Sequence, residues 1–173
     1  MHLRSRLPQT AFAFRGYNVK NLGRTAGLLA HPVYGPVVAR YLGRASAVCS
    51  SVLGRRVDLE RRVREGREST LETFGEDIGL IMSVELAQVE LLRDYFGVDY
   101  SAARVGLGYS LGEVTALCAS GVYQMEDVLL LADVQVAELD EVAGVAVMDV
   151  RRVFRVQAGR PGEHPSQLHR RLR

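Results

Sequence analysis

A serine between two glycines is the feature of this sequence that most limits its possible folds. Residues 108–112 read G-Y-S-L-G, after the mostly apolar residues 103–107 and before the helix-forming residues 113–119. A G-x-S-x-G run between a strand and a helix is typical of a nucleophile elbow, because the glycines leave room for a tight turn and the serine takes a strained conformation. The sequence therefore predicts a strand, a sharp turn that exposes the Ser110 hydroxyl, and a helix.

The same serine also has a simpler explanation, in which it only caps the helix. Glu113 stands three residues after Ser110, which is the spacing of a capping box. The two roles are compatible. In the nucleophile role, the N–H of Leu111 at the start of the helix is a candidate donor to a developing oxyanion.

Regular apolar spacing predicts the other elements. Strands are expected at residues 11–14 and 104–108, and a further strand from 143 to 150. Helices are expected at residues 37–52, 71–96 and 126–139, with Gly97 as a helix stop. Strands that alternate with helices predict an α/β fold with a mostly parallel sheet, whose ligands lie at the carboxyl ends of the strands.

The residues around the serine resemble a family of acyltransferases. Residues 108–132 read GYSLGEVTALCASGVYQMEDVLLLA. They are similar to malonyl-CoA:acyl-carrier-protein transacylases and to the acyltransferase domains of fatty-acid and polyketide synthases, where a G-x-S-L-G-E elbow precedes a helix, a glycine turn and an acidic pair. Residues 11–18 resemble the family's opening strand and glycine-rich loop, and residues 80–87 resemble the helix before its elbow strand. The match spans residues 11 to 135.

This resemblance implies a fold and an activity. The fold is a partial acyltransferase core, similar to that of α/β-hydrolases, with a nucleophile elbow. The activity is transfer of an acyl group of malonyl type from coenzyme A to the phosphopantetheine arm of an acyl carrier protein, through an acyl-enzyme on Ser110. The coenzyme A thioester is a substrate, and no bound cofactor or metal is implied. The setting is fatty-acid or polyketide biosynthesis.

Two positions depart from the family's pattern. The family's first loop reads F-P-G-Q-G, whereas residues 14–18 read F-R-G-Y-N, so Tyr17 stands in place of the glutamine. The backbone N–H of Tyr17 remains a second candidate oxyanion donor beside that of Leu111. Malonyl-selective members carry an arginine where this chain has Gln135, the expected acyl-selecting position. Glutamine lacks the charged fork that binds a carboxylate, so strict malonyl selectivity is not expected.

The general base is the missing part of the predicted site. In the resembled family it is a histidine far downstream of the serine, but His164 and His169 lie among arginines and prolines unlike the family's histidine motif. His2 and His31 are weaker candidates because of their positions. We expect this chain to lack the catalytic histidine.

Composition divides the chain near residue 150. The chain has 173 residues, of which 47% are hydrophobic, and this is enough for one hydrophobic core. Its formal net charge is +2. Residues 151–173 hold seven arginines and a single acid, Glu163. The sequence predicts an incomplete acyltransferase-like domain at residues 1–150 and a disordered tail at 151–173. Because Lys20 is the only lysine beside 21 arginines, we expect GC-rich coding and a truncated or frame-shifted end.

Several classes of protein are excluded. No apolar run approaches the roughly 18 residues that span a bilayer, and no secretory h-region is present, so a cytoplasmic protein without a membrane partner is expected. Cys49 and Cys118 lack metal or disulfide spacing, and Cys118 is expected in the core. Arg and Glu alternate over residues 55–67, which predicts a solvated helix face or loop and not a nucleic-acid patch.

Three functional hypotheses remain. The first is the serine acyltransferase, with acyl-CoA and acyl carrier protein as partners, and residues 111–113 and 126–127 favour it. The second is a serine esterase or thioesterase of α/β-hydrolase type, in which water accepts the acyl group. The third is a non-catalytic, truncated remnant that keeps the fold without turnover.

Overall fold

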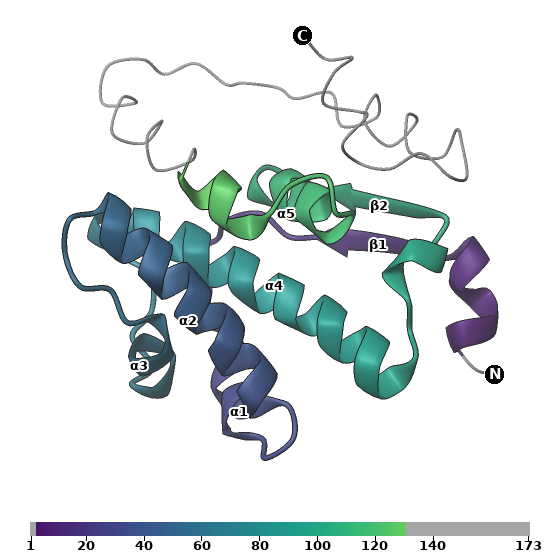
Figure 1. Cartoon of the computed structure of the whole chain (residues 1–173), viewed down its shortest axis with the longest axis horizontal. Coiled ribbons are helices and arrows are strands. Elements are labelled where there is room, and N and C mark those ends of the chain that lie inside the picture. Colours follow the sequence, from purple (N-terminus) through teal and green to yellow (C-terminus); the bar gives the residue numbers. More distant parts are fainter. Residues whose placement is uncertain (1–2, 131–173) are drawn as a thin grey trace, which may run out of the picture. The chain divides into compact units, whose positions relative to one another are not determined.

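The computed structural model of the protein describes residues 3–130. Its elements are, in order, η1 (Leu3–Gln9), β1 (Ala11–Phe14), α1 (Thr25–Ala30), α2 (Gly35–Val52), α3 (Leu59–Arg64), η2 (Leu71–Thr73), α4 (Phe74–Phe96), η3 (Tyr100–Ala102), β2 (Val105–Gly108) and α5 (Leu111–Ala119). Residues 125–130 are also helical. Figure 1 shows the long helix α4 running beneath the two strands, with α5 beside them and α2 along its other flank. The described region is a helix-rich α/β structure.

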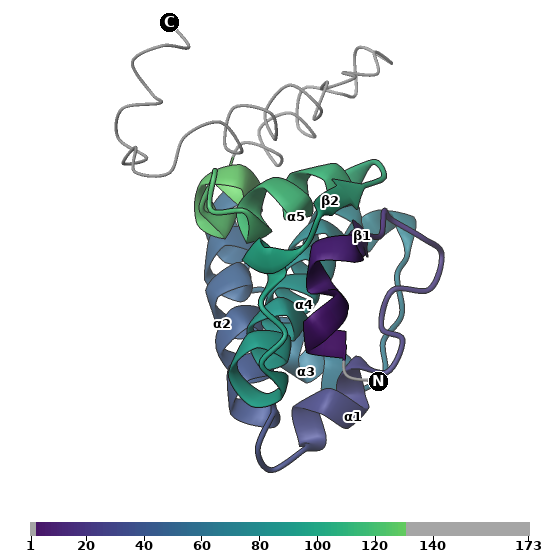
Figure 2. The same cartoon turned by 90° about the vertical axis from the view of Figure 1, so that its right-hand side faces the viewer.

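The two strands form the described sheet. β1 and β2 pair in parallel, with Ala11 opposite Val105 and Phe14 opposite Gly108, and they lie side by side in both Figures 1 and 2. Parallel neighbours need a long crossover, which the helices α1 to α4 provide. Strands are confirmed at both predicted segments, their pairing is parallel as expected for the sheet, and both point their carboxyl ends toward the same edge.

The two long helices carry most of the core. Pro36 in the first turn of α2 suits a helix start, because its missing N–H has no partner there in any case. Where α4 crosses α2, Gly79 leaves no room for a side chain, since a Cβ there would lie 2.7 Å from the Cys49 Sγ. α4 ends at Gly97 in the left-handed region with φ 59°, as predicted, while the first three residues of the expected helix form η2 instead.

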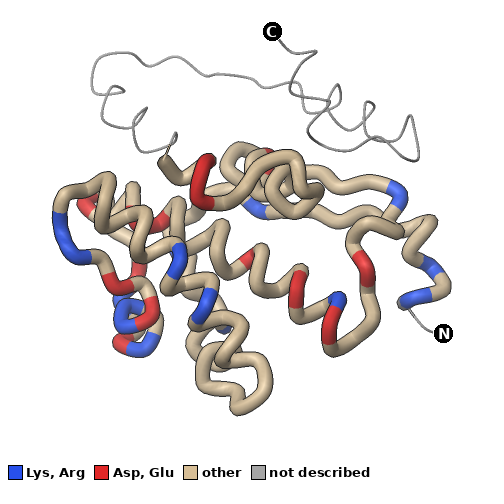
Figure 3. Tube along the Cα trace, viewed as in Figure 1, with Lys and Arg blue, Asp and Glu red and all other residues tan. Residues whose placement is uncertain are grey.

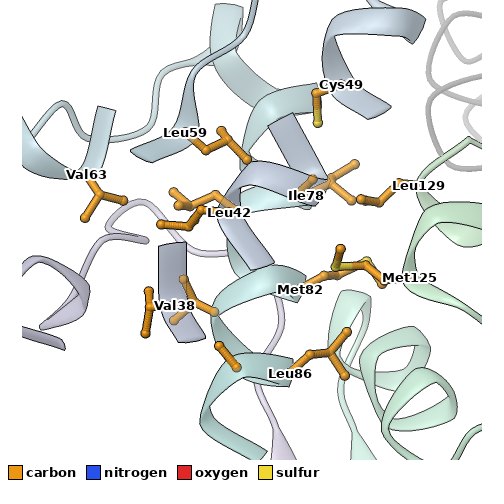
Figure 4. Packing of buried hydrophobic residues seen from close by; sticks show 14 of the residues in the cluster. Val38, Leu42, Cys49, Leu59, Val63, Ile78, Met82, Leu86, Met125 and Leu129 are labelled. Atoms are coloured by element: carbon orange, nitrogen blue, oxygen red, sulfur yellow. The ribbon is translucent and has the colours of Figure 1, made fainter. Parts of the chain in front are cut away.

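Apolar side chains from four segments meet between these helices. Figure 4 shows Leu42 of α2, Leu59 of α3, Met82 of α4 and Met125 of the last described helical segment within one cluster of buried side chains. The first three are fully buried, and Met125 is 3% exposed. Because α4 contacts α2 on one side and α5 on the other, this core also fixes the helix that follows Ser110.

The prediction that residues 55–67 form a solvated face is wrong for Arg62. Figure 3 shows basic and acidic residues mixed along α3. The Arg62 side chain, however, is only 3% exposed and pairs with Glu76 at 3.3 Å and with the fully buried Asp77. The Arg62 Nε also donates to the Arg67 carbonyl at 3.0 Å. α3 therefore turns one charged residue inward to meet two acids at the start of α4.

The remaining predicted segments lie outside the described residues. They are residues 131–139 of the last expected helix, the strand at 143–150 and the tail at 151–173. Within residues 3–130, no helix has the length and apolar character needed to cross a membrane.

Candidate active site

Ser110 occupies a sharp turn between β2 and α5. Its backbone has φ 54° and ψ −122°, and it is the only non-glycine residue with positive φ among residues 3–130. Such a conformation costs about 1–3 kcal/mol and persists only where the surroundings enforce it. Two hydrogen bonds close the turn, from the Gly112 N–H to the Tyr109 carbonyl at 3.0 Å and from the Glu113 N–H to the Ser110 carbonyl at 2.9 Å.

The Ser110 side chain does not cap α5. Ser110 holds the N-cap position, but its hydroxyl makes no capping hydrogen bond, and the residue is exposed. The capping role considered from sequence is therefore not observed. The hydroxyl is available at the surface of the turn.

Three glycines let the backbone come close around this turn. A Cβ on Gly108 would lie 2.0 Å from the Gly112 backbone carbon, and one on Gly112 would lie 2.3 Å from the Phe14 carbonyl oxygen. A Cβ on Gly16 would lie 2.8 Å from the Tyr109 carbonyl oxygen and 3.4 Å from the Ser110 Cβ. The loop after β1 is thus packed directly against the serine.

The two predicted oxyanion donors belong to these adjoining segments. Leu111 is the first residue of α5, where a helix leaves its N–H groups without helical partners. Within residues 3–130, neither the Leu111 N–H nor the Tyr17 N–H donates a hydrogen bond. Their role as a pair of donors stays a prediction.

The Tyr17 side chain reaches toward α4. Its ring lies 5.0 Å from that of Phe74, centroid to centroid, and its hydroxyl donates to the Asp77 Oδ2 at 3.3 Å. Burial first, and then the charge of Asp77, raise the pKa of Tyr17. Tyr17 thus ties the loop beside Ser110 to the acid that Arg62 holds in the core.

Glu85 of α4 is a polar residue that the sequence analysis did not single out. Its Oε1 accepts the Arg15 N–H at 2.8 Å, while its buried Oε2 has no hydrogen-bond partner among residues 3–130. Burial raises the pKa of Glu85, against smaller lowering effects of the Arg15 N–H, the Thr115 hydroxyl and the Arg15 charge. The Thr115 proton itself is directed to the Leu111 carbonyl at 3.4 Å. A lone acid within the apolar residues 80–87 was the signal available in the sequence.

We expect Glu85→Gln to stabilise the protein near neutral pH. Since the folded-state pKa of Glu85 is raised, the folded protein binds a proton that the unfolded chain releases, and this contribution to stability falls as pH rises above the ordinary glutamate value. The variant should raise the free energy of unfolding by about 1 kcal/mol at pH 7.5, the scale of one unsatisfied buried group. Urea unfolding at pH 4.5 and 7.5 measures the difference, which should shrink at the lower pH.

The matched control is Glu72→Gln, the same substitution at an exposed position. Glu68 and Glu126 have lowered pKa values, so their contributions to the free energy of unfolding fall as the pH falls, opposite to that of Glu85. The effect of Glu85 is therefore isolated by the difference between wild type and variant at each pH. An equal effect of Glu85→Gln at both pH values would contradict its raised pKa.

The other predicted site residues are not brought to the turn. His31 joins α1 to α2, where its Nδ1 accepts the N–H groups of Val33 and Tyr34 at 3.2 Å each and its ring stacks on Tyr34. Burial raises the pKa of the Cys118 thiol to about 12, so it stays protonated and packs against the core as predicted. Gln135, His2, His164 and His169 lie outside the described residues. No group of three or more potential metal ligands gathers within residues 3–130.

Comparison with known proteins supports one relationship. No protein-family model and no curated protein matches this sequence. Among solved structures, the acyltransferase domain of SpnD, in complex with 2-(pent-4-yn-1-yl)malonyl, matches with a TM-score of 0.54 and 25% identity over 73% of this chain. The structure resembles an acyltransferase domain. The matched region is 28% of the SpnD chain, so this protein corresponds to a minor part of its relative's length.

Proposed function

We propose that this chain is the serine-bearing part of an acyltransferase that moves an acyl group of malonyl type from coenzyme A to an acyl carrier protein. The observation that carries the proposal is the turn at Ser110, an exposed serine with positive φ directly after a parallel strand. The likeness to a domain solved with a malonyl compound supports the same chemistry.

In the proposed reaction the Ser110 oxygen attacks the thioester carbonyl and its proton passes to a base. The N–H groups of Leu111 and Tyr17 stabilise the oxyanion of the tetrahedral intermediate. The carbon–sulfur bond then breaks, and coenzyme A leaves as the thiol after taking up a proton. The phosphopantetheine thiol attacks the Ser110 ester in the same manner, which restores the serine and completes the transfer.

The base of this reaction is not found in the described region. His31 is the one histidine among residues 3–130, and its Nδ1 is already occupied by two backbone N–H groups. A serine without its base loses nearly all of the joint contribution of the catalytic residues. The proposed activity therefore requires a base from outside residues 3–130.

We expect the isolated chain to form little acyl-enzyme with malonyl-CoA, and imidazole added as an external base to increase it at least ten-fold. Intact-mass spectrometry measures the malonylated fraction. Ser110→Ala should abolish labelling, whereas Ser101→Ala, an exposed serine of η3, should leave it unchanged.

The possible outcomes separate the hypotheses. Absence of labelling under all conditions, or equal labelling of the Ser110→Ala variant, would contradict the proposal. Full labelling without imidazole would contradict the expectation that the chain lacks a catalytic base. Labelled protein that loses its acyl group to water faster than to added pantetheine would favour the hydrolase.

A further inference from the structure

Three basic side chains that form no ion pair with the described residues line one pocket outside the serine turn. Most arginines of the described chain pair with acids, namely Arg40, Arg44, Arg55, Arg61, Arg62, Arg64, Arg67 and Arg93. Arg15, Lys20 and Arg24 form no such ion pair within residues 3–130, yet all three line one pocket of about 320 Å³ between the loop after β1 and α4. Unpaired cations around one hollow attract an anion.

The loop that carries these cations is firmly held. Arg15 donates through both terminal nitrogens to Asn21, at 3.1 Å to its Oδ1 and at 2.9 Å to its carbonyl. Asn21 is only 5% exposed, and its own N–H donates to Glu68 at 2.9 Å. The charge of Lys20 helps to lower the pKa of Glu68, but the Glu68 Oε2 accepts the N–H groups of Asn21 and Leu22. The pocket is therefore formed before any ligand binds.

An apolar groove adjoins this pocket. It has a volume of about 590 Å³, and its walls include Leu28, Tyr34, Leu91, Leu92 and Phe96. Arg24, Leu28 and Gln88 line both hollows, so Arg24 stands where the charged pocket meets the apolar groove.

We propose that the two hollows form one binding site for a single-chain amphiphile with an anionic oxygen head group, such as an alkyl carboxylate or an alkyl phosphate. The head group lies among Arg15, Lys20 and Arg24. The hydrocarbon chain lies along Leu28, Leu92 and Phe96. Each methylene that leaves water strengthens binding about four-fold, so the chain and the head group act together.

Glu85 is the one acid among the lining residues of the pocket, and it opposes this ligand when ionised. The groups that face it are the Arg15 N–H from the loop and Thr115 from α5. Burial raises its pKa, which favours the protonated carboxyl, and its Oε2 has no partner among residues 3–130. A glutamine at this position removes the repulsion.

Calorimetric titration of the full chain with octanoate and octyl phosphate tests the proposal, with octanol and inorganic phosphate as probes of the two halves. We expect each amphiphile to bind at least ten-fold more tightly than either half. The double variant Lys20→Gln/Arg24→Gln should weaken binding at least ten-fold, and Leu92→Gln should weaken octanoate but not inorganic phosphate. Glu85→Gln should strengthen the binding of both amphiphiles, whereas Lys20→Gln/Arg24→Gln weakens it.

The control is Arg56→Gln/Arg104→Gln, which removes the same net charge. Both arginines are exposed, lie outside the pocket and form no ion pair with residues 3–130. Circular dichroism confirms that each variant is folded. The proposal is overturned if octanol binds as tightly as octanoate, if the control loses as much affinity, or if no amphiphile binds at millimolar concentration. Ser110→Ala should bind normally, so failure of the acyltransferase proposal leaves this result unaffected.

Discussion

Gly108→Ala and Gly112→Ala are each expected to lower the free energy of unfolding by about 3 kcal/mol, the upper range for overpacking. The new methyl group of the first variant would lie 2.0 Å from the Gly112 backbone carbon, and that of the second would lie 2.3 Å from the Phe14 carbonyl oxygen. The obstructing atoms are backbone on both sides, so no side chain can rotate away. Equilibrium unfolding in urea measures the loss.

Gly43→Ala is the control for these variants. Gly43 is exposed within α2, and a Cβ there meets no heavy atom within 4 Å. Alanine favours a helix over glycine by about 1 kcal/mol, so this variant should gain stability. If Gly108→Ala is as stable as the wild-type protein, the turn at Ser110 is not packed as described.

Arg62→Met is expected to cost about 3–5 kcal/mol, the usual penalty for leaving a buried charge without its partner. The variant removes the cation that Asp77 and Glu76 share, while Asp77 stays fully buried. Guanidinium unfolding gives the magnitude. Adding Asp77→Asn to Arg62→Met should recover part of the loss, because the asparagine carries no charge.

Arg64→Met provides the comparison within the same helix. Arg64 pairs with Glu60 one turn earlier, but 56% of its side chain is exposed. Surface pairs at this spacing contribute about 0.3–0.5 kcal/mol. Equal losses from the two arginines would contradict the buried position of Arg62.

The sequence predicts the parts of the structure that depend on local patterns. The turn at Ser110 follows from Gly108 and Gly112, because any side chain at these positions would collide with the backbone. The end of α4 follows from Gly97. The parallel direction of β1 and β2 follows from the α/β alternation. Each of these depends on a few adjacent residues or on a regular period.

The residues missed by the sequence analysis depend on partners that are distant in the chain. Arg62 has the same neighbours in sequence as the exposed arginines of α3, and only Glu76 and Asp77 on α4 distinguish it. Arg15, Lys20 and Arg24 lie in and beside a loop, where no period indicates a shared face. Their convergence becomes visible only in the folded chain, where all three line one pocket.

The parallel pairing of β1 with β2 determines the order in which this protein can mature during synthesis. β1 leaves the ribosome before β2, which is translated only after α1, α2, α3 and α4. The contacts between α2 and α4 join segments nearer in sequence, so loop closure favours them first. Until residue 108 has emerged, β1 carries Phe12 and Phe14 on an unpaired edge, a surface that molecular chaperones and other nascent chains recognise. The turn at Ser110 can close only after α1 to α4 have been translated, so a chain that stops before residue 110 contains this helical core without the candidate site.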